Sequence, residues 1–337
     1  MKSILEKLFV GKLRQKLVGL IENTLNNNGD FRSLKRGQKH HAARLKRLDG
    51  LVYDLLPPVF YVNKKTEAAI SEFRSTFNLP DDLNVSISKN DVMFHVELVN
   101  SGGSVQRAFL DYFLGGLYGL DILKKLSEVK FGGLSKADAV LDFACGYGRI
   151  SRFLLTELPA EKVWVSDVRH QGVDFQKETF GFNGVYSSFT PSEFDPQQTF
   201  DAIFVGSLFS HLDEEPFLGW LRKLFDCLSD RGFLALSVHD ISLNTSKKGE
   251  NFTFRDSSED IVFSEIEDSI DDGGAYGTAY VSEARMHDFM KKMDIDPARC
   301  VRIPKAFGGL QDVYVISRDK NVFDPSQIKL EKFYELM

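Results

Sequence analysis

Cysteine is scarce in this sequence, and its scarcity excludes several kinds of protein. Three cysteines in 337 residues cannot build a disulfide framework, and their spacing is not that of zinc ligands. They are Cys145, Cys227 and Cys300. We therefore expect reduced, structural thiols and no metal site. Internal repeats, coiled-coil heptads and collagen triplets are also missing, so the composition is that of a globular protein.

Long hydrophobic runs are missing as well. The longest apolar stretch, residues 108–123, is broken by two aspartates and is too short to span a bilayer. The first residues carry Lys2, Glu6 and Lys7 between their apolar side chains, so they lack the uninterrupted core of a signal peptide. These two observations predict a cytoplasmic protein.

The formal net charge of -6 conceals a division along the chain. Residues 1–50 hold 12 Lys and Arg against 4 Asp and Glu, whereas residues 51–337 hold 30 against 44. Apolar residues of the segment 4–25 recur at helical spacing between basic residues, which predicts an amphipathic helix. Two contacts fit this basic arm, an anionic membrane surface at the inner face of the membrane or a protein surface. Nucleic acid is not expected as a partner, because the arm has no interleaved aromatic side chains and the body is acidic.

The most informative stretch is an apolar run from Ala139 that stops at two glycines and then becomes helical. Gly146 and Gly148 allow the backbone to turn tightly and to approach a ligand closely. A second strand pattern follows at 162–168 and ends in Asp167, about 20 residues beyond the glycines. An acid at that distance suits the two hydroxyls of a ribose. The spacing therefore predicts a nucleotide pocket, although acids at strand ends also form turns.

These residues resemble a known family. The segment 141–149, Leu-Asp-Phe-Ala-Cys-Gly-Tyr-Gly-Arg, is similar to motif I of the class I S-adenosylmethionine (SAM) dependent methyltransferases, commonly written LDxGCGxGR. Segments 200–213 and 228–236 look like the fourth and fifth strands of that family, and the likeness covers roughly residues 135 to 318. Ala144 stands where the family has its first glycine, which leaves slightly less room at the methionine end of the cofactor.

The resemblance implies a Rossmann-like α/β fold, with a mostly parallel seven-stranded sheet whose last strand is antiparallel, and a mainly helical N-terminal extension. Strand and helix signals alternate from Ala139 onward, which favours the same architecture. We expect four parts along the chain. They are a basic arm (1–49), a mainly helical region that covers the substrate (50–134), a SAM-binding core (135–318) with an insertion at 241–280, and a C-terminal tail (319–337).

Several local elements can also be predicted. The periodicity indicates a helix at 65–77 and one or two mostly buried helices at 105–126, with glycines as weak points. Alternation of Val92, Phe94 and Val96 favours a strand within 83–98. The segment 230–232 is expected to be a turn before the fifth strand of the core.

The resemblance implies SAM as the cofactor and assigns roles around the glycine loop. Asp142 is expected near the methionine end, Asp167 at the ribose and Ser188 at the border of the adenine. Arg149 is placed either at the cofactor carboxylate or in solvent. The complete predicted cofactor-binding set is Asp142, Ala144, Gly146, Gly148, Arg149, Asp167 and Ser188.

Two histidines are candidates for catalysis. Methyl transfer is an in-line displacement, and an attacking hydroxyl benefits from a base that takes its proton. His211 and His239 follow the predicted fourth and fifth strands, at the sheet edge where ligands of open α/β folds gather. The alternative is that each only hydrogen-bonds a loop.

The predicted activity is methylation of a hydroxyl of a sugar, a glycan or another small hydroxylated acceptor. The acidic insertion at 241–280 suits a polyol better than a polyanion, and the motifs of adenine, cytosine and metal-dependent catechol methylation are missing. Two alternatives stay open. One is a noncatalytic SAM-binding or interaction protein, and the other is a nicotinamide-dependent dehydrogenase, although the loop lacks the third glycine of the dinucleotide fingerprint.

Overall fold

The computed structural model does not describe every segment for which the sequence makes a prediction. The basic arm and much of the insertion lie outside the described residues. The structure describes residues 59–60, 64–102, 104–244, 249–256, 277–321, 323–331 and 333. Among the helices of this described part, none is both long enough and apolar enough to cross a membrane.

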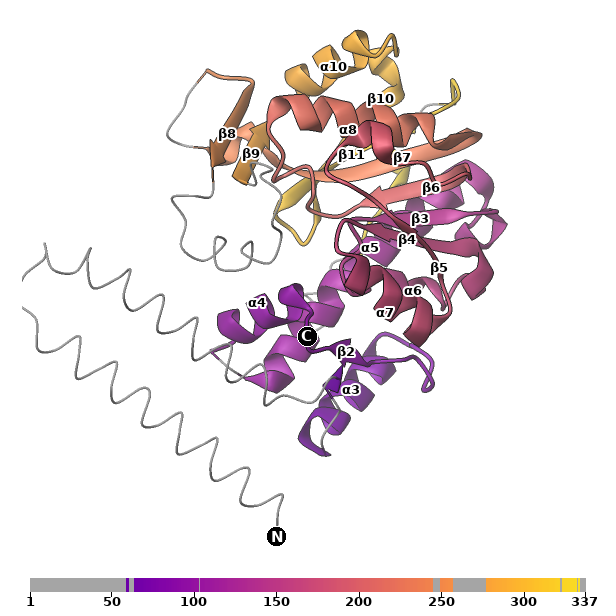
Figure 1. Ribbon diagram of the computed structural model, residues 1–337, viewed down its shortest axis with the longest axis vertical. Coiled ribbons are helices and arrows are strands. Elements are labelled where there is room, and N and C mark those ends of the chain that lie inside the picture. Colours follow the sequence, from indigo (N-terminus) through magenta and orange to yellow (C-terminus); the bar gives the residue numbers. More distant parts are fainter. Residues whose placement is uncertain are drawn as a thin grey trace, which may run out of the picture. The chain divides into compact units, whose positions relative to one another are not determined.

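The described chain alternates helices and strands along most of its length (Figure 1). Its main helices are α3 (Lys64–Thr76), α4 (Val92–Asn100), α5 (Val105–Phe131), α6 (Ser151–Leu154), α7 (His170–Phe180), α8 (Glu214–Asp226) and α10 (Glu283–Lys292). Its strands are β1 (Val59–Phe60), β2 (Ile87–Ser88), β3 (Val140–Phe143), β4 (Val163–Asp167), β5 (Asn183–Tyr186), β6 (Phe200–Val205), β7 (Leu228–Asp240), β8 (Phe252–Asp256), β9 (Gly277–Val281), β10 (Cys300–Phe307) and β11 (Gln311–Ser317).

Seven strands form the central sheet in the order β10-β11-β7-β6-β3-β4-β5. The pairings of β3 to β7 are parallel, and β11 pairs antiparallel with both β7 and β10. The predicted fold class is thereby confirmed, including the antiparallel last strand. A hairpin of β8 and β9, which the sequence did not indicate, extends the carboxyl end of β7 through the parallel pairing of His239 with Tyr280.

The two faces of the sheet are covered by different helices, as Figure 1 shows. Successive strand residues point to opposite faces, so Val140 belongs to the core beneath α5, α6 and α7, whereas Leu141 belongs to the core beneath α8 and α10. Strands buried on both faces read as nearly continuous apolar runs, which is how β3 and β6 appear in the sequence.

The predicted strand within 83–98 is wrong for most of its length. Residues 92–100 form helix α4, and only Ile87–Ser88 pair as a strand. The Asp91 carboxylate accepts a hydrogen bond from the Phe94 backbone N–H at 3.1 Å, so it caps the start of the helix. The apolar pattern of this segment fits the period of a helix as well as that of a strand, and the cap favours the helix.

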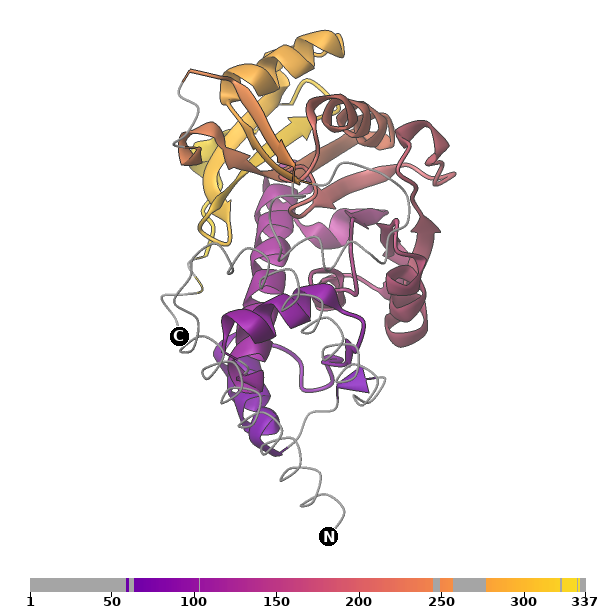
Figure 2. The same ribbon diagram turned by 60° about the vertical axis from the view of Figure 1, so that its left-hand side comes forward.

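The region predicted as one or two helices is the single helix α5, which Figure 2 shows as uninterrupted. Its glycines serve close packing. A Cβ placed on Gly116 would lie 2.2 Å from the Arg149 carbonyl oxygen and 2.4 Å from the Phe153 ring. Ser104 caps the start of α5, and Gly132 ends it in the left-handed conformation at φ 76°.

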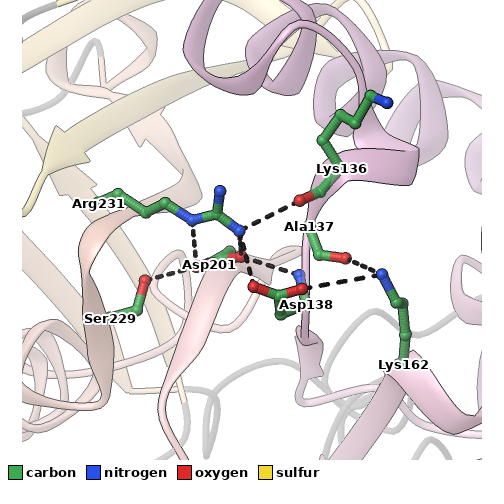
Figure 3. A network of polar contacts seen from close by, with 7 residues as sticks. All are labelled: Lys136, Ala137, Asp138, Lys162, Asp201, Ser229 and Arg231. Carbon is green, nitrogen blue, oxygen red and sulfur yellow. Dashed lines mark hydrogen bonds and ion pairs between the residues drawn. The ribbon is translucent and has the colours of Figure 1, made fainter.

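The predicted turn at 230–232 is also wrong, because these residues lie inside β7. The pairing with β6 is irregular between Phe200 and Ala202, which accommodates the additional residues of β7. Near this point Asp201 accepts hydrogen bonds from the Ser229 hydroxyl, the Arg231 guanidinium and the Asp138 backbone N–H (Figure 3). This network ties β6 and β7 together at the amino end of β6.

Candidate functional site

The carboxyl ends of four neighbouring parallel strands bring the predicted site residues to one edge of the sheet. Asp142 lies in β3, Asp167 ends β4, His211 follows β6 and His239 lies near the end of β7. This is the edge where ligands bind in open α/β sheets. The structure therefore places the cofactor candidates and the catalytic candidates in one row, in the strand order β4, β3, β6 and β7.

Helix α7 holds the glycine loop through a side chain that the sequence analysis missed. Gln176 is fully buried and donates from Nε2 to the Gly146 carbonyl at 2.9 Å and to the Cys145 sulfur at 3.0 Å. Its Oε1 accepts from the Ser151 hydroxyl.

All three cysteines are buried and unpaired, as expected.

The two motif glycines have different surroundings. A Cβ on Gly146, which has φ 53°, would meet no atom within 4 Å, so the loop borders open space at this residue. A Cβ on Gly148, at φ 83°, would come within 3.0 Å of Gln176 and Phe180 of α7. Gly146 thus suits a close approach of a ligand, and Gly148 is required for packing of the loop on α7.

Asp167 joins the loop to strand β4 and still has capacity to bind a ligand. One carboxylate oxygen accepts from the Gly146 backbone N–H and the other from the Arg169 backbone N–H, both at 2.8 Å. A carboxylate has about four acceptor positions, so Asp167 retains capacity for a further donor such as a ribose hydroxyl. Burial raises the pKa of Asp167, and hydrogen bonds from the backbone of Arg169, Gly146 and Val168 oppose the shift.

Asp142 is buried beside the loop, and its surroundings point to a missing donor. Its Oδ2 has no hydrogen-bond partner among the described residues, and burial raises its pKa to about 7. SAM carries an amino group at its methionine end and two ribose hydroxyls, and all three are hydrogen-bond donors. The carboxylates of Asp142 and Asp167 therefore fit this cofactor.

Ala144, the departure from the glycine of the family motif, has φ 58°. The left-handed region costs a residue with a Cβ about 1 kcal/mol, so the loop stores a small strain at this position. The backbone of Ala144 therefore lies in a region that glycine adopts without strain.

Two further cofactor candidates have contacts within the protein. The Arg149 guanidinium lies 3.9 Å from a carboxylate oxygen of Glu97 in α4. The Ser188 hydroxyl accepts from the Thr190 backbone N–H and donates to the Thr190 carbonyl, so it forms a local turn. Arg149 thus faces the N-terminal helices, and the predicted contacts of these two residues with SAM stay predictions.

Arg152 connects the loop to the N-terminal region, and the sequence analysis gave it no role. Its side chain is fully buried and donates to the carbonyls of Tyr147, Gly148 and Ser86 at 2.6–3.1 Å. The Tyr112 hydroxyl lies 3.5 Å from its Nη2 and donates to Asp91. One guanidinium therefore joins the glycine loop, α5 and the chain before α4.

The two catalytic candidates are neighbours in space. The rings of His211 and His239 have centroids 6.5 Å apart and are nearly perpendicular, at 82°. His211 Nδ1 lies 2.8 Å from the carbonyl oxygen of Gly277 at the start of β9. Burial lowers the pKa of His211 to about 4 and also lowers the pKa of His239, so both imidazoles are neutral near pH 7. Asp240, the residue after His239, pairs with Arg302 at 2.8 Å.

Comparison with known proteins gives one family match. Residues 141–234 match the family described as "Methyltransferase domain". The matched segment runs from β3 into β7, so it contains the glycine loop, Asp167 and His211. No curated protein sequence matches the chain.

Solved structures resemble the chain at low identity. The plantazolicin methyltransferase BpumL, in complex with a pentazolic desmethylPZN analog and SAH, has 12% identity and a TM-score of 0.44, with 75% of this chain and 97% of that chain covered. The amino pentose methyltransferase CalS10 from Micromonospora echinaspora has 13% identity and a TM-score of 0.44, with 60% and 91% covered. The sugar N-methyltransferase KedS8 from a Streptoalloteichus species has 12% identity and a TM-score of 0.43, with 61% and 88% covered.

Proposed function

Since the chain carries a domain of the class I SAM-dependent methyltransferase family, we propose that it methylates a hydroxyl of a sugar, a glycan or another small hydroxylated acceptor. SAM supplies a methyl group that is already activated on a sulfonium sulfur. The residues of the chain then have to hold the acceptor oxygen in line and take its proton. The observation that carries this proposal is the half-buried imidazole of His211, which follows the carboxyl end of β6 and has its Nδ1 2.8 Å from the Gly277 carbonyl oxygen.

The contacts of His211 support its role as the base. A carbonyl oxygen only accepts hydrogen bonds, so the contact with Gly277 requires the proton to be on Nδ1. Nε2 therefore carries the lone pair. A hydroxyl becomes strongly acidic while its oxygen bonds to the methyl carbon, so a weakly basic imidazole is sufficient to take the proton. A pKa of about 4 keeps His211 ready for this at neutral pH.

The residues at the carboxyl ends of β3 and β4 support binding of SAM next to the histidines. Asp167 offers acceptor positions for the ribose, and Asp142 offers a buried carboxylate oxygen to a donor. The acidic composition of 241–280 favours a neutral or cationic acceptor over a polyanion. A cytoplasmic location, and contact of the arm at 1–49 with a membrane or a protein, are further proposals that rest on sequence alone.

The test is transfer of labelled methyl from SAM into fractionated cell extract, with small molecules, glycans, protein and nucleic acid separated. We expect label in the glycan or small-molecule fraction, and no label with Asp167→Ala. The His211→Ala variant is expected to lose about 100-fold or more in rate with SAM affinity unchanged. His287→Ala, a change on the outer helix α10, is the matched control and should keep its rate.

Three outcomes would contradict the proposal. Label only in protein or nucleic acid would refute the acceptor class. An unchanged rate for His211→Ala would refute the base. SAM binding without label in any fraction would favour the noncatalytic alternative.

A further inference from the structure

A polar cluster behind His239 contains a residue to which no role has been given. Gln311, the first residue of β11, contacts His239 and three serines at the ends of β6 and β7. Its Oε1 lies 2.6 Å from Ser237 Oγ, and its Nε2 lies 3.3 Å from His239 Nε2. The orientation of this amide decides which His239 nitrogen carries the proton.

Two backbone contacts determine the orientation of the amide. The Ser207 backbone N–H donates to Ser237 Oγ at 2.7 Å, so the Ser237 hydroxyl proton is available to be donated to Gln311 Oε1. The Ser210 hydroxyl donates its proton to the Ser207 carbonyl at 2.6 Å, so Ser210 Oγ accepts from Gln311 Nε2 at 3.5 Å. Both serines therefore place the amide oxygen toward Ser237 and the amide nitrogen toward His239.

The orientation of the amide has a direct consequence for the histidine. An amide nitrogen only donates, so His239 Nε2 accepts and the imidazole proton is on Nδ1, a buried atom that has no hydrogen-bond partner among the described residues. A second proton on Nε2 would face the N–H of Gln311. Burial lowers the pKa of His239, and the backbone of Ala279 opposes the shift. The other groups around the ring, His211 and Tyr280, add no negative charge, and Asp240 is paired with Arg302.

We infer that Gln311 is a positioning residue that holds His239 as the neutral Nδ1-protonated tautomer, so that His211 serves as the base of this pair. The part that concerns His211 rests on the proposed function. His239 then shapes the site and contributes no lone pair to the acceptor, because its Nε2 is engaged by the amide. Both histidines follow a strand in the sequence, and the contact with β11 distinguishes them.

The test is imidazole ¹⁵N NMR of the full chain between about pH 5 and pH 8, with the seven histidines separated by comparison with His239→Gln. We expect wild-type His239 to show the neutral Nδ1-protonated pattern throughout. In Gln311→Glu the new carboxylate faces Nε2, and the pKa of His239 should rise by about one to three units. Gln327→Glu, an exposed glutamine in another part of the chain, should leave the titration unchanged.

Two results would overturn the inference. One is an Nε2-protonated tautomer in the wild type, and the other is the same His239 titration in Gln311→Glu as in the wild type. The NMR result is independent of turnover, so it stays readable if the acceptor is not a hydroxyl. In the transfer assay His211→Gln should lose at least tenfold more rate than His239→Gln, and equal losses would refute the division of roles.

Discussion

Replacing Arg152 by methionine is the substitution from which we expect the largest loss of stability near the cofactor loop. The change keeps an unbranched side chain but removes the charge and every donor of the guanidinium. The carbonyls of Tyr147, Gly148 and Ser86 would lose their donor in a buried setting. The rings of Tyr112, Phe113 and Phe180 would lose a cation 5.1–5.7 Å from their centroids.

The magnitude follows from these contacts. A hydrogen bond to a charged group contributes about 1.5–3 kcal/mol, but removing the buried charge also removes its desolvation cost. Breaking a buried charged network typically costs about 3–5 kcal/mol, and we expect a loss in this range from the free energy of unfolding. This is a large part of the roughly 5–15 kcal/mol that stabilises a typical domain.

The assay is urea unfolding at equilibrium, combined with calorimetric measurement of SAM binding. Arg107→Met is the matched control, because Arg107 lies on the exposed side of α5 and its ion pair with Asp111 is worth at most about 1 kcal/mol. We expect SAM binding to weaken in Arg152→Met, since two of the freed carbonyls belong to the loop. A loss below about 1 kcal/mol would refute the reasoning, because it would mean that the loop does not depend on the guanidinium.

Three further predictions concern packing and pH. Gly116→Ala should lower the free energy of unfolding by about 3 kcal/mol in urea, because the added Cβ would meet the backbone of Arg149. Gly115→Ala should lower it by less than about 1 kcal/mol, because its Cβ meets only the movable Arg149 side chain, at 3.2 Å. Equal losses for the two variants would contradict the packing argument. Burial would raise the pKa of Asp201, but hydrogen bonds from Arg231 and Ser229 outweigh it and lower the pKa, so Asp201 stabilises the fold above its ordinary pKa of 3.8 and this contribution is lost as pH falls through the lower folded value. Asp201→Asn should therefore reduce the loss of unfolding free energy at acid pH. An unchanged loss would contradict this. Burial raises the pKa of Asp142 from 3.8 to about 7, so between these values the folded state holds a proton that the unfolded state has lost. The free energy of unfolding without SAM should therefore fall as pH rises across that interval. Asp142→Asn should remove this fall, which unfolding curves at about pH 5 and pH 8 would test.

Sequence patterns were reliable where the evidence lies within a few residues. The strand before the glycines and the acid at the end of the next strand are both short-range patterns. The alternation of apolar residues and the glycine spacing were sufficient for the fold class, because they reflect local geometry and burial on both faces of a parallel sheet. The short-range pattern was misleading at 92–100, because the apolar spacing there fits both a strand and a helix. The cap by Asp91 favours the helix.

The sequence by itself thus determined the glycine loop, its acids and the row of strand ends at which the histidines lie. Only the tertiary structure shows which residues from distant parts of the sequence hydrogen-bond to the loop and to the histidines. Gln311 reaches His239 across 72 positions of sequence because β11 pairs antiparallel with β7, Asp312 opposite Val238. Arg152 meets Ser86 across 66 positions because the chain before α4 packs on the loop. Such contacts depend on strand register and helix packing, which no local pattern records, and our proposal of His211 rather than His239 as the base rests on them.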